Sequence, residues 1–157
     1  MEMKAIGRTR RVSGSDNQSS VHSTRLHWRQ RGRQPTLQSS KTPRAGRAQG
    51  DVALLLAGDV EALAEAQLAQ GARTLRAQLL KAGHHGSRTS STDAFLRAVA
   101  PETVVFSMGL QNPFGFPHAD VVARAEALGA RTMRTDQGAV IAVSDGHNLR
   151  ARSFAPP

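Results

Sequence analysis

Three short strand-like runs in the second part of the chain each end in a turn that leads into a segment of helical periodicity. The runs occupy residues 52–57, 76–82 and 103–108. Their length is that of β-strands rather than of buried helices. Runs that are apolar on both faces are typical of a parallel sheet with helices packed on its surface. The alternation therefore predicts an α/β layered domain.

Helices are expected between these strands. The first, at residues 60–70, has an apolar side made of Val60, Leu63, Ala64 and Leu68. Glu61 and Glu65 occupy its first turns, where a negative charge suits the helix dipole. Two further helices are expected at residues 92–99 and 119–128, because apolar residues recur there at helical spacing.

The end of the chain is expected to add β-structure. Residues 131–135 and 139–143 flank a turn-forming segment at residues 136–138, a pattern that predicts a β-hairpin. Asp145-Gly146 is a second turn signal, and residues 149–154 after it are expected to add an edge strand.

The first fifty residues differ sharply from the rest. Residues 1–50 hold eleven Lys/Arg and two Asp/Glu, whereas residues 51–157 hold ten of each, so the whole net charge of +9 lies in the first segment. This segment has few apolar residues and sustains no strand or helix periodicity. We therefore predict a disordered Arg/Ser/Gln-rich segment at residues 1–50 and a folded domain at residues 51–157.

Three interpretations of the basic segment stay open. It is a solvated basic run, or it is an arm that binds nucleic acid through phosphate neutralisation by arginines and stacking on Trp28. In the second case the chain is a nucleic-acid-binding protein that acts through its N-terminal arm. The third hypothesis is unrelated or frame-shifted translation, which the abrupt change near Gly50 suggests.

Composition narrows the other possibilities. The chain has no cysteine, which excludes disulfides and Cys-type zinc sites and leaves His, Asp and Glu as the strong metal ligands. No run of about 18 apolar residues occurs, so neither a membrane span nor a secretion signal is expected in this chain.

Side chains that can bind metal directly follow two of the predicted strands. Asp59 comes after the run at residues 52–57, and His84-His85 comes after the run at residues 76–82. The carboxyl ends of neighbouring parallel strands meet at one edge of a sheet, so these side chains are expected to converge on a metal site for hydrolysis. The alternatives are that Asp59 caps the next helix and that the histidines are surface turn residues.

His118 is a third candidate. It follows the turn-rich loop at residues 109–117 and begins the helix predicted at residues 119–128. It is expected either to reach the same sheet edge from a third strand or to be an exposed residue at the start of that helix. His147, in the Asp145-Gly146 turn, is interpreted as a turn residue only.

Three motifs carry a family resemblance. They are Gly58-Asp59, His84-His85-Gly86-Ser87 and Gly115-Phe116-Pro117-His118, within residues 51–154. Together they resemble the C-terminal half of the metallo-β-lactamase-fold domain of ComEC-type DNA-uptake competence proteins. The resemblance implies the C-terminal half of an αββα sandwich and a metal-dependent hydrolase of phosphodiesters, proposed to process DNA during natural transformation. It also implies zinc or another divalent metal as cofactor, DNA as partner, and a full-length family that is integral to the bacterial inner membrane.

The resemblance also implies roles for individual side chains. Asp59 matches the metal-bridging aspartate, and His85 matches a metal ligand. His84 matches a group that either supports the metal ligands from behind or polarises the substrate, although the two histidines could exchange roles. His118 joins His84 on the catalytic side of the site.

The chain also departs from the family pattern. The motif HxHxDH, which supplies the family's principal metal ligands, is absent from the sequence, and Phe116 stands at a position that the family often fills with histidine. We therefore expect a half domain that is inactive alone. The alternative is an active small metallo-hydrolase completed by a partner chain, either a second copy or a separate N-terminal half. A half sandwich exposes an apolar sheet face, so oligomers are expected.

Overall fold

The computed structural model describes residues 2–6, 25–29, 51–71 and 75–154. Its helices are α1 (Ala62–Gly71), α2 (Asp93–Val99) and α3 (Ala119–Ala127). Its strands are β1 (Glu2–Ile6), β2 (Arg25–Arg29), β3 (Leu54–Leu56), β4 (Leu79–Lys81), β5 (Thr103–Phe106), β6 (Arg131–Arg134), β7 (Ala139–Ser144) and β8 (Leu149–Phe154). Two short 3-10 turns are η1 (Gly83–Gly86) and η2 (Thr135–Gln137).

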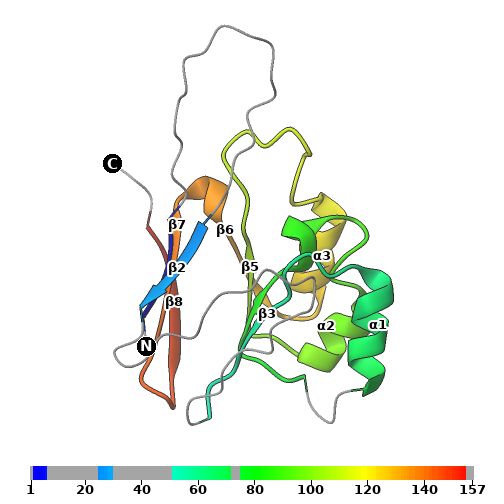
Figure 1. The fold of residues 1–157 in the computed structure, drawn as a ribbon, viewed down its shortest axis with the longest axis horizontal. Helices are drawn as coiled ribbons and strands as arrows, with labels where there is room; N and C mark the ends of the chain where they lie inside the picture. The colour runs from blue at the N-terminus through cyan, green and yellow to red at the C-terminus, as the bar shows by residue number, and fades with distance from the viewer. Residues whose placement is uncertain (1, 7–24, 30–50, 72–74, 155–157) are drawn as a thin grey trace, which may run out of the picture.

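The strands form two four-stranded sheets that pack against each other (Figure 1). One is parallel, in the order β3, β4, β5, β6, and the other is antiparallel, in the order β2, β1, β7, β8. The three helices cover the other face of the parallel sheet. The described part therefore has three layers of helices, sheet and sheet, and the predicted α/β architecture is confirmed.

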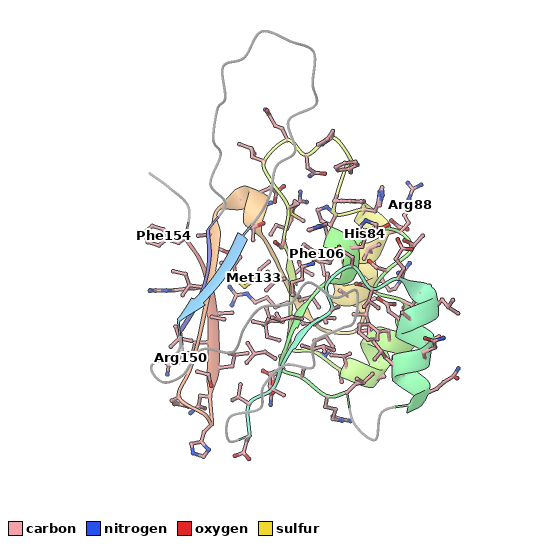
Figure 2. All side chains as sticks on the ribbon, in the orientation of Figure 1. His84, Arg88, Phe106, Met133, Arg150 and Phe154 are labelled. Atoms are coloured by element: carbon pink, nitrogen blue, oxygen red, sulfur yellow. The ribbon has the colours of Figure 1, made fainter. Side chains whose placement is uncertain are left out.

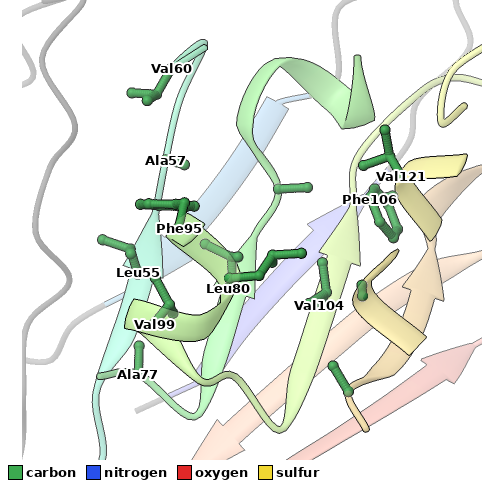
Figure 3. Packing of buried hydrophobic residues seen from close by; sticks show 14 of the residues in the cluster. Leu55, Ala57, Val60, Ala77, Leu80, Phe95, Val99, Val104, Phe106 and Val121 are labelled. Carbon is green, nitrogen blue, oxygen red and sulfur yellow. The ribbon is translucent and has the colours of Figure 1, made fainter. Parts of the chain in front are cut away.

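Three of the parallel strands, β3, β4 and β5, carry successive apolar residues because both of their faces are buried. Side chains alternate between the two faces of a strand. Leu55, Leu80 and Val104 pack with the helices, whereas Leu54, Leu79 and Val105 pack with the antiparallel sheet. Figure 3 shows Phe95 and Val99 of α2 over this first group. Each such side chain contributes about 1.5–3 kcal/mol by leaving water, so both layers are needed to stabilise the sheet.

The apolar side predicted for the first helix is wrong in two members, since Val60 is buried but precedes α1 and Leu63 does not pack. Leu63 is 77% exposed, whereas Glu65, which does lie in the first turn of α1, is fully buried. The Glu65 carboxyl accepts backbone hydrogen bonds from Ser91 and Thr92. These bonds compensate the burial of a polar group, which a pattern of apolar residues cannot reveal.

The hairpin predicted for residues 131–143 is also wrong, because β6 and β7 belong to different sheets. β6 pairs in parallel with β5, and β7 pairs antiparallel with β1 and β8. The turn η2 carries the chain from one sheet to the other. Its Thr135 hydroxyl donates to the Met108 carbonyl at 2.7 Å and accepts from the Met108 N–H at 2.8 Å, which ties the crossing to the end of β5. The edge strand predicted after Asp145-Gly146 is confirmed as β8.

The expected disorder of residues 1–50 does not hold for two short segments. Glu2–Ile6 and Arg25–Arg29 are strands, and β1 lies between β2 and β7. Pairing of this kind uses backbone groups, which every sequence carries, so it needs no apolar periodicity. The rest of residues 1–50 lies outside the described residues, as do the side chains of β1 and β2, so the expected disorder there and the proposed basic arm stay predictions.

Candidate functional site

The two histidines lie on η1, directly after β4. Both have left-handed backbone conformations, with φ of 41° at His84 and 58° at His85. Such angles are uncommon for residues other than glycine and often mark functional turns. The His84 N–H donates to the carbonyl of Gly58 at 2.9 Å, and the Ser87 N–H donates to the carbonyl of His84 at 2.9 Å. The turn therefore joins the ends of β3 and β4, as their parallel pairing predicts.

Gly83 and Gly86 frame this turn because neither position has room for a side chain. A Cβ on Gly83 would collide with the backbone that follows β3. A Cβ on Gly86 would lie 2.6 Å from Cβ of Pro117 and 2.8 Å from Cδ1 of Phe106. The His118 N–H also donates to the Gly86 carbonyl at 3.0 Å. This close approach attaches the histidine turn to the start of α3.

His85 has one ring nitrogen held and one available. Its Nδ1 contacts the carbonyl oxygen of Ser107. A carbonyl can only accept, so Nδ1 carries the proton and Nε2 presents its lone pair. Nε2 lies 3.9 Å from Oδ1 of Asp59. Burial lowers the pKa of the His85 imidazole and the charge of Lys81 lowers it further, while the Ser107 carbonyl and Asp59 oppose this. His85 therefore presents an imidazole nitrogen with a free lone pair beside a carboxylate.

His84 is held by Glu61. Its Nδ1 lies 2.7 Å from Oε1 of Glu61, and the Thr89 hydroxyl donates to the same oxygen at 3.0 Å. These two hydrogen bonds, that of His84 first, lower the pKa of the Glu61 carboxyl. The sequence predicted Glu61 only as a residue that complements a helix dipole. Its position two residues after Asp59 was the signal that could have predicted its place in the site.

Phe116 contacts all three candidate histidines. Its ring centroid lies 5.7 Å from that of His84, 6.3 Å from that of His85 and 5.6 Å from that of His118. His118 is half-buried and is the N-cap residue of α3, although its side chain makes no capping hydrogen bond. The structure therefore brings the predicted third histidine to the same edge, with its ring against Phe116.

Asp59 is not part of α1, which begins three residues later at Ala62. Two donors that share one tetrahedral zinc ion at about 2.1 Å lie roughly 3.4 Å apart. The separation of 3.9 Å between Asp59 and His85 is close to this value. Among the described residues, no group of three or more His, Asp or Glu side chains is arranged to hold a metal. The two donors thus fit part of a metal site, and a full zinc site needs further ligands.

Two side chains, Glu65 and Arg124, hold the loop after the histidines, and the sequence did not predict this role for either. Glu65 of α1 accepts from the Ser91 N–H at 2.5 Å and from the Thr92 N–H at 2.8 Å. Arg124 of α3 donates to the carbonyls of Ser90 at 3.3 Å and Ser91 at 2.9 Å. The loop is therefore attached to both α1 and α3.

Lys81, the last residue of β4, is also buried. Its Nζ donates to the Gly58 carbonyl at 3.2 Å, beside Asp59. Burial lowers the pKa of Lys81 to about 8, and the charge of Asp59 opposes the shift. The folded protein thus releases this proton more easily than the unfolded chain, whose lysine has the ordinary pKa of 10.5.

Raising the pH from about 7 to about 9.5 is expected to stabilise the wild-type chain by about 2 kcal/mol relative to Lys81→Met. In this window the unfolded lysine still binds a proton that the folded lysine has lost. This stabilisation is complete above the pKa of the lysine in the unfolded chain, and it is lost as the pH falls through about 8, the pKa of Lys81 in the folded protein. Urea unfolding in EDTA at both pH values measures it. Arg97→Met, which removes an exposed cation of α2, should keep the wild-type pH dependence, and equal pH dependence of Lys81→Met and wild type would contradict the expectation.

The chain is similar in sequence to known proteins. No family model matches the chain. It is 31% identical to ComE operon protein 3 of Bacillus subtilis (strain 168) over 108 residues. The aligned region covers 69% of this chain and 14% of that protein. It is 42% identical over 88 residues to Competence protein ComA of Neisseria gonorrhoeae, covering 55% of this chain and 13% of that protein. It is 42% identical over 76 residues to Recombination protein 2 of Haemophilus influenzae, covering 48% of this chain and 9% of that protein.

The chain thus spans only a small part of each relative's length. No helix within residues 51–71 and 75–154 has both the length and the hydropathy that crossing a membrane requires. The motifs of the family resemblance, which carry Asp59, His84, His85 and His118, come together at one edge of the parallel sheet. By these motifs and the sequence matches, the chain is a homologue of a segment of the ComEC-type competence proteins.

Proposed function

We propose that the chain is the C-terminal part of a metal-dependent phosphodiester hydrolase with a metallo-β-lactamase-like fold, that it serves DNA uptake, and that it is inactive alone. Two features support this. An αββα sandwich without one of its helix layers would have the order helices, sheet, sheet, which is the order of the described layers. The relatives are named as competence and recombination proteins.

The observation that carries the proposal is the pairing of Asp59 with His85. The Ser107 carbonyl fixes the tautomer of His85, so that Nε2 is free at 3.9 Å from the Asp59 carboxylate. Orientation of a ligand histidine by a carbonyl on its other nitrogen is the usual arrangement in metal sites. A divalent ion held there would supply positive charge for a phosphate group and would make a water molecule more acidic.

The neighbouring histidines would act on the substrate. Glu61 orients the His84 ring through Nδ1, which leaves Nε2 to exchange a proton with a phosphate oxygen. His118 contacts the same Phe116 ring and would be a second proton donor at this edge. Two donors fall short of the four ligands of a stable zinc site, and the HxHxDH motif that would supply more is absent from this sequence.

Titration with Mn²⁺ is expected to broaden the NMR signals of Asp59 and His85 before any others, with weak affinity, since two donors bind a metal less tightly than four. Replacing His85 by alanine should remove this selective broadening. His147→Ala is a matched control, because the exposed His147 pairs with Asp51 at 3.3 Å, on the segment that precedes β3. Equal broadening of the His147–Asp51 pair would argue against a prepared site at Asp59 and His85.

Metal content and turnover test the incomplete site. After desalting, the purified chain is expected to retain less than about a tenth of an equivalent of zinc and to leave bis(p-nitrophenyl) phosphate intact. Stoichiometric zinc together with turnover that His85→Ala abolishes would show instead an active small hydrolase, and would refute the part of the proposal that the chain is inactive alone.

A further inference from the structure

Three nearly parallel rings lead outward from the histidine turn. The ring of His85 stacks on Phe116 with an interplanar angle of 21°, and Phe116 stacks on Phe114 with an angle of 22° and a centroid distance of 5.6 Å. Phe114 is 70% exposed. The column therefore begins at a candidate metal ligand and ends at an aromatic ring that is open to solvent.

The loop that carries Phe114 is held in one conformation by its own hydrogen bonds. The Asn112 side chain accepts from the Phe116 N–H at 2.9 Å and donates to the Phe116 carbonyl at 2.7 Å. The Gly115 N–H donates to the Asn112 carbonyl at 3.4 Å, and Gly115 has a φ of +67° that favours glycine. A ring that is already positioned loses little freedom when a ligand stacks on it.

The exposed ring of Phe114 can take a flat ligand on its open face. Its loop neighbours Gln111 and Asn112 are polar and Gly115 has no side chain, while Pro113 and the exposed Leu110 are apolar. An exposed aromatic ring is the kind of surface on which single-stranded nucleic acids stack their bases. Arg88, on the loop that follows the histidines, has a 73% exposed side chain and forms an ion pair with Asp120 at 4.0 Å. An ion pair this exposed is weak, so the guanidinium can also contact a phosphate.

We infer that Phe114 is a stacking site for a nucleobase of single-stranded DNA, and that the column from Phe114 to His85 guides the strand toward the histidine turn. A base on the open face of Phe114 would add a fourth ring to the column. The second half of this inference rests on the proposed hydrolase function, whereas the stacking itself does not. Duplex DNA would bind less well, because its bases already stack on one another.

Fluorescence anisotropy with labelled oligothymidine tests the inference in EDTA, so that metal binding and hydrolysis play no part. The reference probe is an oligomer of the same length with abasic sugars, which keeps the phosphates and lacks the bases. The ratio of the two dissociation constants measures the base-dependent part of binding, free of phosphate attraction elsewhere in the chain. Wild type is expected to prefer oligothymidine, and Phe114→Leu is expected to reduce that preference about tenfold.

Three control variants show whether the preference depends on an aromatic ring at this position. Phe114→Tyr keeps an aromatic face and should retain the preference. Phe154→Leu removes another exposed phenylalanine, 59% exposed on β8 in the antiparallel sheet and far from His84 in Figure 2, and should leave the preference unchanged. Leu110→Ala alters an exposed apolar residue of the same loop, 59% exposed, and should also have little effect if stacking rather than apolar contact is measured.

Each outcome of the anisotropy experiment either supports or overturns the stacking of a nucleobase on Phe114. An unchanged preference in Phe114→Leu, or no preference in wild type, overturns it even if the chain proves to bind metal and hydrolyse phosphodiesters. Equal losses in Phe114→Leu and Leu110→Ala, accompanied by loss of self-association in sedimentation, would identify the loop as a contact between copies of the chain and would also overturn it. Base-dependent binding without selective Mn²⁺ broadening at Asp59 and His85 would leave the stacking site intact and count only against the proposed metal site.

Discussion

Replacing Glu65 by alanine is expected to lower the free energy of unfolding by about 4 kcal/mol. The Glu65 carboxyl is fully buried and accepts from the backbone N–H groups of Ser91 and Thr92. Its removal leaves one buried and one partly buried donor without partners, and each unsatisfied donor costs about 1–3 kcal/mol. Because small domains are stable by only about 5–15 kcal/mol, the variant should unfold at much lower urea concentration than wild type.

Two further variants make this test specific. Glu65→Gln keeps one accepting oxygen but places an NH₂ group against the other backbone donor, so it should lose about half as much stability. Glu102→Ala removes an exposed carboxylate next to β5 and should change the unfolding free energy by less than about 0.5 kcal/mol. A loss of less than about 1 kcal/mol in Glu65→Ala would mean that Glu65 does not clamp the loop after the histidines.

Replacing Gly86 by alanine is expected to destabilise the chain by about 4 kcal/mol and to disturb the histidine turn. Gly86 has a φ of +88°, and a Cβ there would meet Pro117 at 2.6 Å and Phe106 at 2.8 Å. The left-handed conformation alone costs about 1–2 kcal/mol for alanine. Overpacking in a dense interior adds about 1–3 kcal/mol, because Phe106 is fully buried and cannot move away freely.

Gly129→Ala separates these two contributions. Gly129 has a similar φ of +82°, but a Cβ there would meet no atom within 4 Å. It should therefore show the conformational penalty alone, and the difference between the two variants should measure the close approach of η1 to the start of α3. Similar unfolding free energies of Gly86→Ala and Gly129→Ala, measured in urea, would contradict the tight contact. NMR signals of His85 and His118 should shift in Gly86→Ala and stay in place in Gly129→Ala.

Much of the parallel sheet could be predicted because its signal is local. β3, β4 and β5 are buried on both faces, so each carries successive apolar residues, and each is followed by a segment with helical periodicity. The convergence of Asp59, His85 and His118 also followed from chain order, since strand ends of a parallel sheet share an edge. Residue type and position along the chain were sufficient for these expectations.

The clamps around the site could not be predicted because their partners are distant in sequence. Glu65 is buried by amides 26 and 27 positions further along the chain, and Lys81 is buried against the carbonyl of Gly58. A carboxylate or an ammonium group is normally exposed, so only a specific partner explains its burial. Phe116, read in the sequence as a departure from histidine, is the ring that all three histidines contact.

The sequence by itself determined the α/β class, the strand ends that carry Asp59 and His84-His85, and the relation to ComEC-type proteins. These depend on periodicity and motifs, which are properties of short segments. Only the tertiary structure decided that β7 joins the antiparallel sheet rather than pairing with β6, that β1 lies beside it, and that Asp59 and His85 lie 3.9 Å apart. These depend on which backbone and side-chain groups find partners across the fold, because an unpaired polar group in the interior is too costly to keep.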